Sequence, residues 1–208
     1  MELTVGNHPL TFGLAAAFTG PLLRLTDTEF LCCQFTGRSS CGKTTILQVA
    51  ASVCGQYTRY TQSWNATANG LEGICKQRND GLLIIDEQSE ADSRSIQETS
   101  YMIANGNGKR RARTNGEARE IARWRLTALS SGEVSIGERT AEGGRTPHAG
   151  QEVRWLNIPV GLEDVRELHG LLSAQELIDR LKEGCLQHYG HAWNIFLERL
   201  VHEAPALS

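Results

Sequence analysis

Residues 36 to 47 read Thr-Gly-Arg-Ser-Ser-Cys-Gly-Lys-Thr-Thr-Ile-Leu, so four residues separate Gly37 from the Gly42-Lys43-Thr44 triplet. This spacing is that of a P-loop, in which glycines let backbone N–H groups curl around a β-phosphate at the start of a helix. Lys43 supplies a charge for the β- and γ-phosphates, and the Thr44 hydroxyl is a ligand for Mg²⁺. The residues expected to hold ATP are Gly37, Ser39, Ser40, Cys41, Gly42, Lys43, Thr44 and Thr45. A glycine-rich turn with a surface lysine is the alternative.

A second chemical signal follows the aliphatic run Leu82-Leu83-Ile84-Ile85, which ends in Asp86 and Glu87. Four aliphatic residues in a row favour a strand buried on both faces of a parallel sheet, and the two acids then lie at its carboxyl end, where such sheets bind ligands. We interpret the pair as a Walker B motif, with Asp86 in the Mg²⁺ shell and Glu87 orienting the attacking water. A buried strand that ends in two solvated acids is the alternative. A complete P-loop upstream favours the functional interpretation.

Two further segments supply candidate catalytic side chains. The apolar segment 124–129 ends in Ser130 and Ser131, and either hydroxyl, at the end of a neighbouring strand, could touch the γ-phosphate or the water. Residues 151–160 are interpreted as the last strand, where Pro159 suits an end or an edge.

The elements that must position these residues form an α/β pattern. Strands are predicted before the P-loop at 30–35, at 56–61, where residues alternate, and at 82–85, 124–133 and 151–160. Helices are predicted after the P-loop, from a Thr67 cap to about Lys76, over 92–105, at 134–141 and from Ser173 onward. The expected fold is a P-loop three-layer sandwich with a mostly parallel five-stranded sheet, an inserted β-hairpin and short C-terminal helices. Residues 1–165 would form the ATPase core, and 166–208 a helical segment of the same domain or a small lid.

The segment from 106 to 120 is unlike the rest of the chain because five cations lie there with only two acids. Asn115-Gly116 is a strong two-residue hairpin signal. The cations on the arms of the predicted hairpin are Lys109, Arg110, Arg111, Arg113 and Arg119. Such a positive finger can neutralise phosphates and bind nucleic acid without sequence preference. A solvated loop and a charged patch that faces another subunit are the alternatives.

Composition restricts the class of protein. The chain has 208 residues, of which 40% are apolar and 22% charged, with a net charge of −3. These values describe a globular protein with one sizeable core and no general attraction to nucleic acid or to anionic membranes. No apolar stretch is long enough to cross a bilayer and the first residues lack the basic start of a secretion signal, so a cytoplasmic location is expected.

The six cysteines show no zinc spacing and are interpreted as reduced, mostly buried thiols. Cys41, at a helix start beside Lys43, is either a plain loop residue or a stabilised thiolate.

Together these motifs resemble an AAA+ ATPase core. More narrowly, the chain is similar to a family of phage, plasmid and mobile-element ATPases that are often fused to primase-like regions and compared with minichromosome-maintenance helicases. Besides the P-loop helix, the resemblance is carried by Trp64-x-Ala66-Thr67-x-Asn69-Gly70-Leu71-Glu72, Leu129-Ser130-Ser131-Gly132-Glu133 and Ala149-Gly150-Gln151-Glu152-Val153-Arg154.

The resemblance implies a homo-oligomeric, usually hexameric ring with ATP between subunits. Lys43, Thr44, Asp86 and Glu87 would act within one subunit, Ser130 or Ser131 as sensor. Arg154 would be the finger that reaches a neighbour's γ-phosphate, because it directly precedes the last core strand; Arg145 and Arg139 are weaker candidates. The basic hairpin becomes a pore loop that grips single-stranded or forked DNA. A primase or replication-initiator partner is expected on a separate chain or segment, and the C-terminal helices leave open whether a lid and a second sensor are present.

The function expected from the sequence is therefore ATP-driven movement on DNA, as a helicase or translocase that serves replication of a mobile element. A nucleotide switch or assembly ATPase without unwinding activity is the second hypothesis, and a small-molecule kinase is the third. Glu87 after Asp86 favours hydrolysis over a switch, and no Asn-Lys-x-Asp motif occurs that would indicate a GTPase.

Overall fold

The structure of the chain is a computed structural model, and it describes residues 1–86, 88–109, 121–144 and 154–207. In this part of the chain a five-stranded sheet has the order β2-β3-β4-β1-β5, and every neighbouring pair is parallel. The strands are β1 (Phe30–Thr36), β2 (Gln62–Ser63), β3 (Gly81–Asp86), β4 (Leu126–Gly132) and β5 (Trp155–Pro159). The fold is thus the predicted α/β class with a parallel sheet of five strands. Residues 110–120, the centre of the predicted hairpin, lie outside the described residues.

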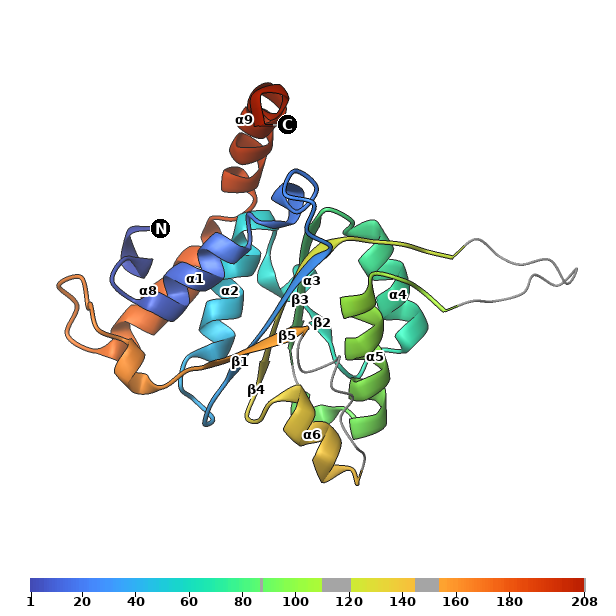
Figure 1. Cartoon of the computed structure of the whole chain (residues 1–208). Coiled ribbons are helices and arrows are strands. Elements are labelled where there is room, and N and C mark those ends of the chain that lie inside the picture. The colour runs from blue at the N-terminus through green and yellow to red at the C-terminus, as the bar shows by residue number, and fades with distance from the viewer. Residues whose placement is uncertain (87, 110–120, 145–153, 208) are drawn as a thin grey trace, which may run out of the picture.

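Helices cover both faces of the sheet (Figure 1). The helices are α1 (His8–Ala16), α2 (Lys43–Cys54), α3 (Tyr57–Tyr60), α4 (Ala68–Gln77), α5 (Ser93–Asn105), α6 (Ile136–Glu142), α8 (Ala174–Gln187) and α9 (His191–Leu207), with short 3-10 turns at Glu2–Thr4, Gly20–Leu22, Gln88–Glu90 and Leu162–Asp164. Core residues of α1, α2 and α8 share one hydrophobic cluster with one face of the sheet, whereas α4, α5 and α6 share a second cluster with the other face. The sheet is therefore buried on both sides, as the continuous aliphatic run in β3 predicts.

Alternation along the strands assigns each side chain to one of the two clusters. Leu82 and Ile84 of β3 belong to the cluster with α2, and Leu83 and Ile85 belong to the cluster with α4 and α5. All four are fully buried, and each contributes about 1.5–3 kcal/mol of transfer free energy. Because the period is two, Asp86 is expected on the α2 side of the sheet, in line with Leu82 and Ile84.

Polar caps set the predicted boundaries of two helices on the far face. The Thr67 hydroxyl accepts a hydrogen bond from the Gly70 N–H at the start of α4, and the Asp92 carboxylate accepts one from the Ser95 N–H at the start of α5. Helix α5 ends at Gly106, whose φ of 66° is in the left-handed region that favours glycine. The predicted helices after Thr67 and over 92–105 are therefore confirmed.

The strand predicted over 56–61 is wrong. Residues Tyr57–Tyr60 form the single helical turn α3, and β2 is limited to Gln62–Ser63. In a strand, residues three apart point to opposite faces, whereas in a helical turn they lie on the same side. Both tyrosines reach β3: the Tyr60 hydroxyl donates to the Leu82 carbonyl, and the Tyr57 hydroxyl donates to Asp86. These contacts with β3 override the alternating pattern.

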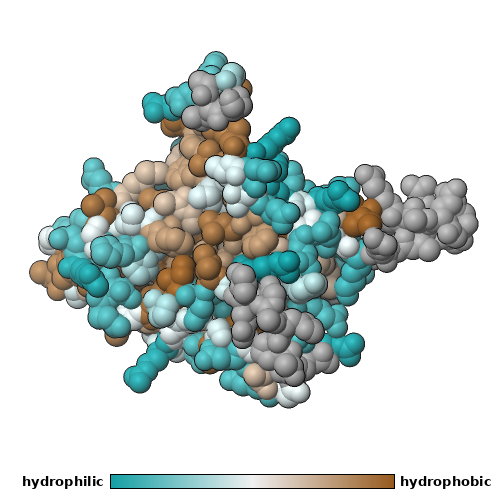
Figure 2. All heavy atoms as spheres, viewed as in Figure 1, coloured by the Kyte–Doolittle hydropathy of each residue, from teal (hydrophilic) through white to brown (hydrophobic). Residues whose placement is uncertain are grey.

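Helix α9 projects from the body of the molecule (Figure 1). The centres of the Phe196 and Phe18 rings lie 5.1 Å apart, and this contact ties the base of α9 to the segment after α1. Figure 2 shows brown apolar surface at the base of α9 and over the adjoining face, and Ile195 and Val201 are 55% and 72% exposed. Within the described residues, no helix combines the length and the apolar character needed to cross a membrane.

All six cysteines are free thiols, and only Cys54 is more than slightly exposed. Burial raises the pKa of both Cys33 and Cys75 to about 12, so these thiols stay protonated at neutral pH. The expectation of reduced, mostly buried thiols is confirmed.

Candidate nucleotide-binding site

The P-loop connects the carboxyl end of β1 to the amino end of α2. Gly37 has φ of 156°, and a Cβ there would collide with the Val160 carbonyl oxygen. Gly42, the N-cap of α2, has φ of 93°, a left-handed conformation that L side chains rarely adopt. Both glycines of the motif are therefore required by the backbone, and the N–H groups at the start of α2 face the carboxyl edge of the sheet.

The Lys43 side chain curls over this loop. Its Nζ donates to the carbonyl oxygens of Gly37 at 2.8 Å and Arg38 at 2.6 Å, and lies 3.6 Å from the Cys41 sulfur. The residue is only 9% exposed. Within the described residues this buried ammonium is held by neutral carbonyls, which leaves its charge available to an anion at the loop.

Asp86 lies across the pocket from this loop, at the carboxyl end of β3. Its carboxylate accepts hydrogen bonds from two hydroxyls: Tyr57 donates to Oδ2 at 2.8 Å, and Ser131 donates to Oδ1. The three residues come from β3, α3 and β4, so the folding of the sheet is what brings them together.

A cavity of about 690 Å³ unites these groups. The residues that line it are Ser39, Ser40, Gly42, Lys43, Thr44, Thr45, Tyr57, Asp86, Gln88, Ser89, Ser131, Gly132, Glu133, Gln175, Ile178 and Lys182. Polar side chains dominate this lining, and its volume falls in the range of pockets that hold small ligands. Of the residues predicted to bind ATP, Gly37 and Cys41 do not line the cavity; Cys41 is buried beneath the loop, where it is 6% exposed.

The structure distinguishes Ser130 from Ser131, which the sequence left as alternative sensors. Ser131 faces the cavity beside Asp86, whereas Ser130 is fully buried on the other face and its Oγ accepts a 2.8 Å hydrogen bond from the Trp64 indole N–H. Strand alternation explains the difference, because adjacent residues of β4 point to opposite faces. Ser131 is therefore the serine whose position suits a sensor.

Exchanging the two serines for alanine should produce opposite results. Ser131→Ala removes a hydrogen bond to a carboxylate in the cavity, so we expect the turnover rate of ATP to fall at least about tenfold with little change in thermal stability. Ser130→Ala leaves the buried Trp64 N–H without its acceptor, and we expect the free energy of unfolding to fall by about 1–3 kcal/mol. Steady-state hydrolysis and thermal denaturation of both variants measure these effects. Equal turnover in the two variants would contradict the assignment.

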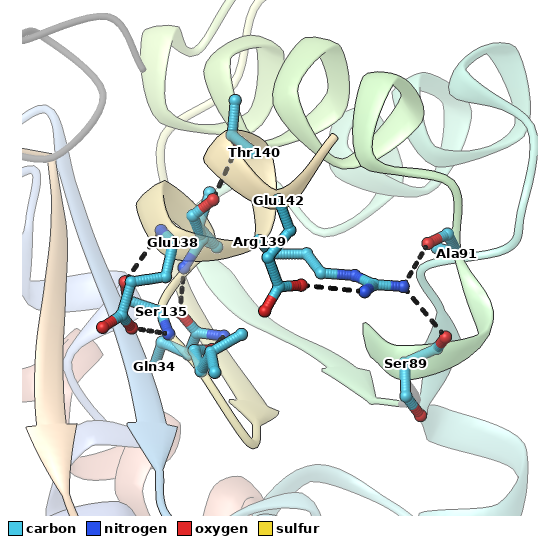
Figure 3. A network of polar contacts seen from close by, with 10 residues as sticks. Gln34, Ser89, Ala91, Ser135, Glu138, Arg139, Thr140 and Glu142 are labelled. Carbon is cyan, nitrogen blue, oxygen red and sulfur yellow. Dashed lines mark hydrogen bonds and ion pairs between the residues drawn. The ribbon is translucent and has the colours of Figure 1, made fainter. Parts of the chain in front are cut away.

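Helix α6 is tied to the sheet and to the turn after β3 by the polar network in Figure 3. The Gln34 side-chain oxygen of β1 accepts a 2.9 Å hydrogen bond from the Ile136 N–H, and a capping box between Ser135 and Glu138 closes the first turn. The Arg139 guanidinium donates to the carbonyl oxygens of Ser89 and Ala91 and pairs with Glu142 at 3.0 Å. Arg139 therefore braces the turn that carries Gln88 into the cavity.

Arg154 lies at the amino end of β5, whereas the P-loop follows the carboxyl end of the neighbouring strand β1. Its guanidinium carbon is 5.8 Å from the centre of the Tyr101 ring of α5. The other end of β5 adjoins the P-loop strand, since Pro159 is paired with Thr36. A five-residue strand spans about 16 Å, so Arg154 is remote from the cavity of its own chain.

Several predicted residues lie outside the described part of the chain. These are Glu87, Arg110, Arg111, Arg113, Arg119 and Arg145. Lys109 is described, and its ammonium pairs with Glu98 of α5 at 3.4 Å. Asn107 and Arg123 form an antiparallel bridge, and the Gly108 N–H donates to the Ala122 carbonyl. The two chain segments that flank 110–120 thus run side by side in opposite directions.

Sequence reasoning missed several cavity residues, of which Tyr57, Gln88 and Lys182 bear most on the chemistry of the site. Tyr57 was assigned to a strand. Gln88 follows the Walker B acids and is 3% exposed, and its amide nitrogen has no hydrogen-bond partner in the described chain. A buried donor of this kind lacks compensation unless it meets an acceptor such as a phosphate oxygen. Lys182 reaches the cavity from α8, and its spacing of one helical turn from Ile178 was the available signal.

The described lining of the cavity offers few carboxylate oxygens for Mg²⁺. No group of three or more His, Cys, Asp or Glu side chains in the described residues could form a metal cage. Mg²⁺ commonly takes one or two protein oxygens together with waters and substrate phosphates. Thr44 and Asp86, which both line the cavity, are oxygen donors of this kind, so the site fits an ion that arrives with a nucleotide.

The parallel sheet, the glycine loop and the cavity at the carboxyl edge define the chain as an α/β protein of the P-loop ATPase class, which supports nucleotide binding. The chain belongs to the DUF927 family, described as a domain of unknown function, whose family model matches residues 1–123. A comparison with curated proteins finds no match.

Solved structures with a similar fold include a protein described as SCCmec type IV Cch, an active helicase. It has a TM-score of 0.69 and 25% sequence identity, over 97% of this chain and 35% of the helicase chain. The present chain therefore spans about a third of that protein. NtrX from Brucella abortus also matches, in complex with ATP (TM-score 0.44, 15% identity, 74% of this chain and 37% of that chain) and with ADP (0.42, 14%, 80% and 49%). The similarity to the helicase chain supports the P-loop ATPase fold assigned above.

Proposed function

We propose that this chain is the ATP-hydrolysing motor domain of a DNA helicase or translocase that serves the replication of a mobile genetic element. The observation that carries the proposal is the cavity in which Lys43 and Thr44 of the P-loop face Asp86 and Ser131 across the carboxyl edge of the sheet. The similarity to an active helicase over 97% of the chain supports the same conclusion. The resemblance of its motifs to mobile-element ATPases supports the biological setting.

Each group in the cavity has a role in phosphoryl transfer. The N–H groups at the start of α2 and the Lys43 ammonium bind the phosphates, and Thr44 and Asp86 offer oxygens to Mg²⁺, which neutralises phosphate charge when bound. Ser131 and the buried Gln88 amide are placed to hydrogen-bond the γ-phosphate end. Glu87, which follows Asp86 in the sequence, is the proposed base that orients the attacking water.

We propose further that the chain works as a homo-oligomeric ring. Arg154 is too far from its own cavity to touch the nucleotide there, which is the arrangement required of a finger that completes a neighbour's site. A charged finger of this kind raises the rate of phosphoryl transfer by about 10³–10⁵ in related enzymes. Hydrolysis would then depend on assembly.

DNA binding is assigned to the basic segment 106–119. The antiparallel bridge between Asn107 and Arg123 supports a hairpin that starts there, and Lys109 is the first of its cations. The protein as a whole has a net charge of −3, so local rather than general charge must attract the phosphates of single-stranded DNA.

Replacing Lys109, Arg110, Arg111 and Arg113 together with alanine should abolish DNA binding and leave nucleotide binding intact. Each lost phosphate contact lowers the slope of log affinity against log salt by about 0.7 for single strands, so the slope should fall by up to about 3. Fluorescence anisotropy with a labelled oligothymidylate at several salt concentrations measures both quantities. The matched control removes four exposed cations elsewhere, namely Arg24, Arg166, Arg180 and Arg199. Equal binding by the two variants would show that the segment does not hold DNA.

A further inference from the structure

The carboxylate of Asp86 is held from two sides. Ser131, on the neighbouring strand β4, donates to Oδ1, and Tyr57 donates to Oδ2 at 2.8 Å. Asp86 is 8% exposed, so these contacts lie in a largely desolvated setting where hydrogen bonds to a charged acceptor are strong. Ser131 is one of the two serines predicted as sensor, whereas no sequence motif predicts a role for Tyr57.

Helix α3 is fixed in a way that aims Tyr57 at Asp86. The Tyr60 hydroxyl donates to the Leu82 carbonyl at 2.7 Å, and the Arg78 guanidinium lies 3.8 Å from the centre of the Tyr60 ring. Burial raises the pKa of Tyr60, so its phenol remains a donor at neutral pH. Leu82 and Asp86 lie near opposite ends of β3, and the two tyrosines of one helical turn therefore anchor α3 along the length of that strand.

This arrangement matters because Mg²⁺ demands near-ideal octahedral geometry. The protein offers few oxygens, so the orientation of the Asp86 carboxylate is a large part of what it contributes. Groups that hydrogen-bond a metal ligand fix its orientation, and their loss typically weakens metal affinity by about 10–100-fold. A phenol on a braced helical turn is suited to this task.

We propose that Tyr57 is a positioning residue for the metal site, whose hydroxyl holds the Asp86 carboxylate in the orientation that Mg²⁺ bound to ATP requires. The inference rests on the proposed function, because it assigns Asp86 to the metal shell. Tyr57 also lines the cavity itself, so no other element needs to move for the contact to act on the bound nucleotide.

The test compares Tyr57→Phe with Tyr60→Phe. Both variants remove one phenolic hydroxyl from the same helical turn, but only the first removes a contact with Asp86. Mn²⁺ is titrated into the purified full chain with a non-hydrolysable ATP analogue, and free Mn²⁺ is followed by electron paramagnetic resonance. The Mg²⁺ dependence of ATP hydrolysis and the melting temperature are measured in parallel.

We expect Tyr57→Phe to weaken Mn²⁺ binding and to raise the Mg²⁺ concentration for half-maximal hydrolysis by about tenfold, with both values unchanged in Tyr60→Phe. Unchanged Mn²⁺ affinity in Tyr57→Phe would overturn the inference. So would an equal loss in both variants that follows their melting temperatures, because Tyr57 would then be a structural anchor like Tyr60. A wild-type chain that binds Mn²⁺ with the analogue but does not hydrolyse ATP would refute the proposed function, and the Mn²⁺ titration would still decide the role of Tyr57.

Discussion

The Lys43→Ala variant is expected to lose ATP hydrolysis by about 10²–10³-fold or more, because preorganised charges at the transferring phosphoryl group contribute effects of this size. Lys43 is 9% exposed, and its ammonium is held at the loop by the Gly37 and Arg38 carbonyls. Alanine removes this buried charge. Among the described residues that line the cavity, Lys182 from α8 is then the remaining cation. Steady-state phosphate release and the binding of a fluorescent ATP analogue measure the loss.

The control for Lys43→Ala is Lys76→Ala, which removes an exposed lysine from the last turn of α4. It should match the wild-type chain in both assays. Turnover within twofold of wild type in Lys43→Ala would mean that the P-loop does not bind the reacting nucleotide.

The second large effect is expected from Asp86→Asn. The substitution keeps the size of the side chain but removes the charge that Mg²⁺ requires, so we expect hydrolysis to fall by at least about 10²-fold. The stability of the fold should be retained, because a neutral amide costs less to bury than a carboxylate and its oxygen can still accept from Tyr57 or Ser131. ATP hydrolysis over a range of Mg²⁺ concentrations and thermal denaturation test the two statements.

Asp80→Asn is the matched control, since it is the same substitution just before β3. Asp80 pairs with Arg125 at 2.8 Å and both side chains are 29% exposed, so the pair contributes at most about 1 kcal/mol. Activity should be unchanged. If Asp86→Asn lost its activity only because it unfolded, its melting temperature would fall well below that of Asp80→Asn, and the metal assignment would fail.

The sequence predicted the structure correctly where the local backbone or local burial determines the residue type. The aliphatic run before Asp86 predicted a strand buried on both faces, and Leu82 and Leu83 do belong to different core clusters. Thr67 predicted a helix start by its capping chemistry, and its side chain accepts the expected N–H; the helix predicted over 92–105 also begins where expected, with Asp92 as its cap. The glycines of the P-loop were recognisable because the loop requires backbone conformations that glycine adopts readily and other residues do not.

The sequence was insufficient wherever a contact joins distant elements. Tyr57 reaches Asp86 only because α3 lies along β3, and the alternation of residues 56–61 gave the wrong secondary structure there. The choice between Ser130 and Ser131 depended on which face of β4 meets α2, which a period of two does not reveal without the sheet. Lys182 joins the cavity through the packing of α8 against α2, a long-range contact that its one-turn spacing from Ile178 does not specify.

The measurement that tests the central claim most directly is steady-state ATP hydrolysis by the purified chain with and without single-stranded DNA, at low and moderate salt, with Lys43→Ala as the blank. Our account predicts hydrolysis above the blank that DNA stimulates and that salt suppresses, because the DNA is held through phosphate contacts. ATP binding without turnover in every condition, or turnover that DNA leaves unchanged at low salt, would contradict a DNA-coupled motor.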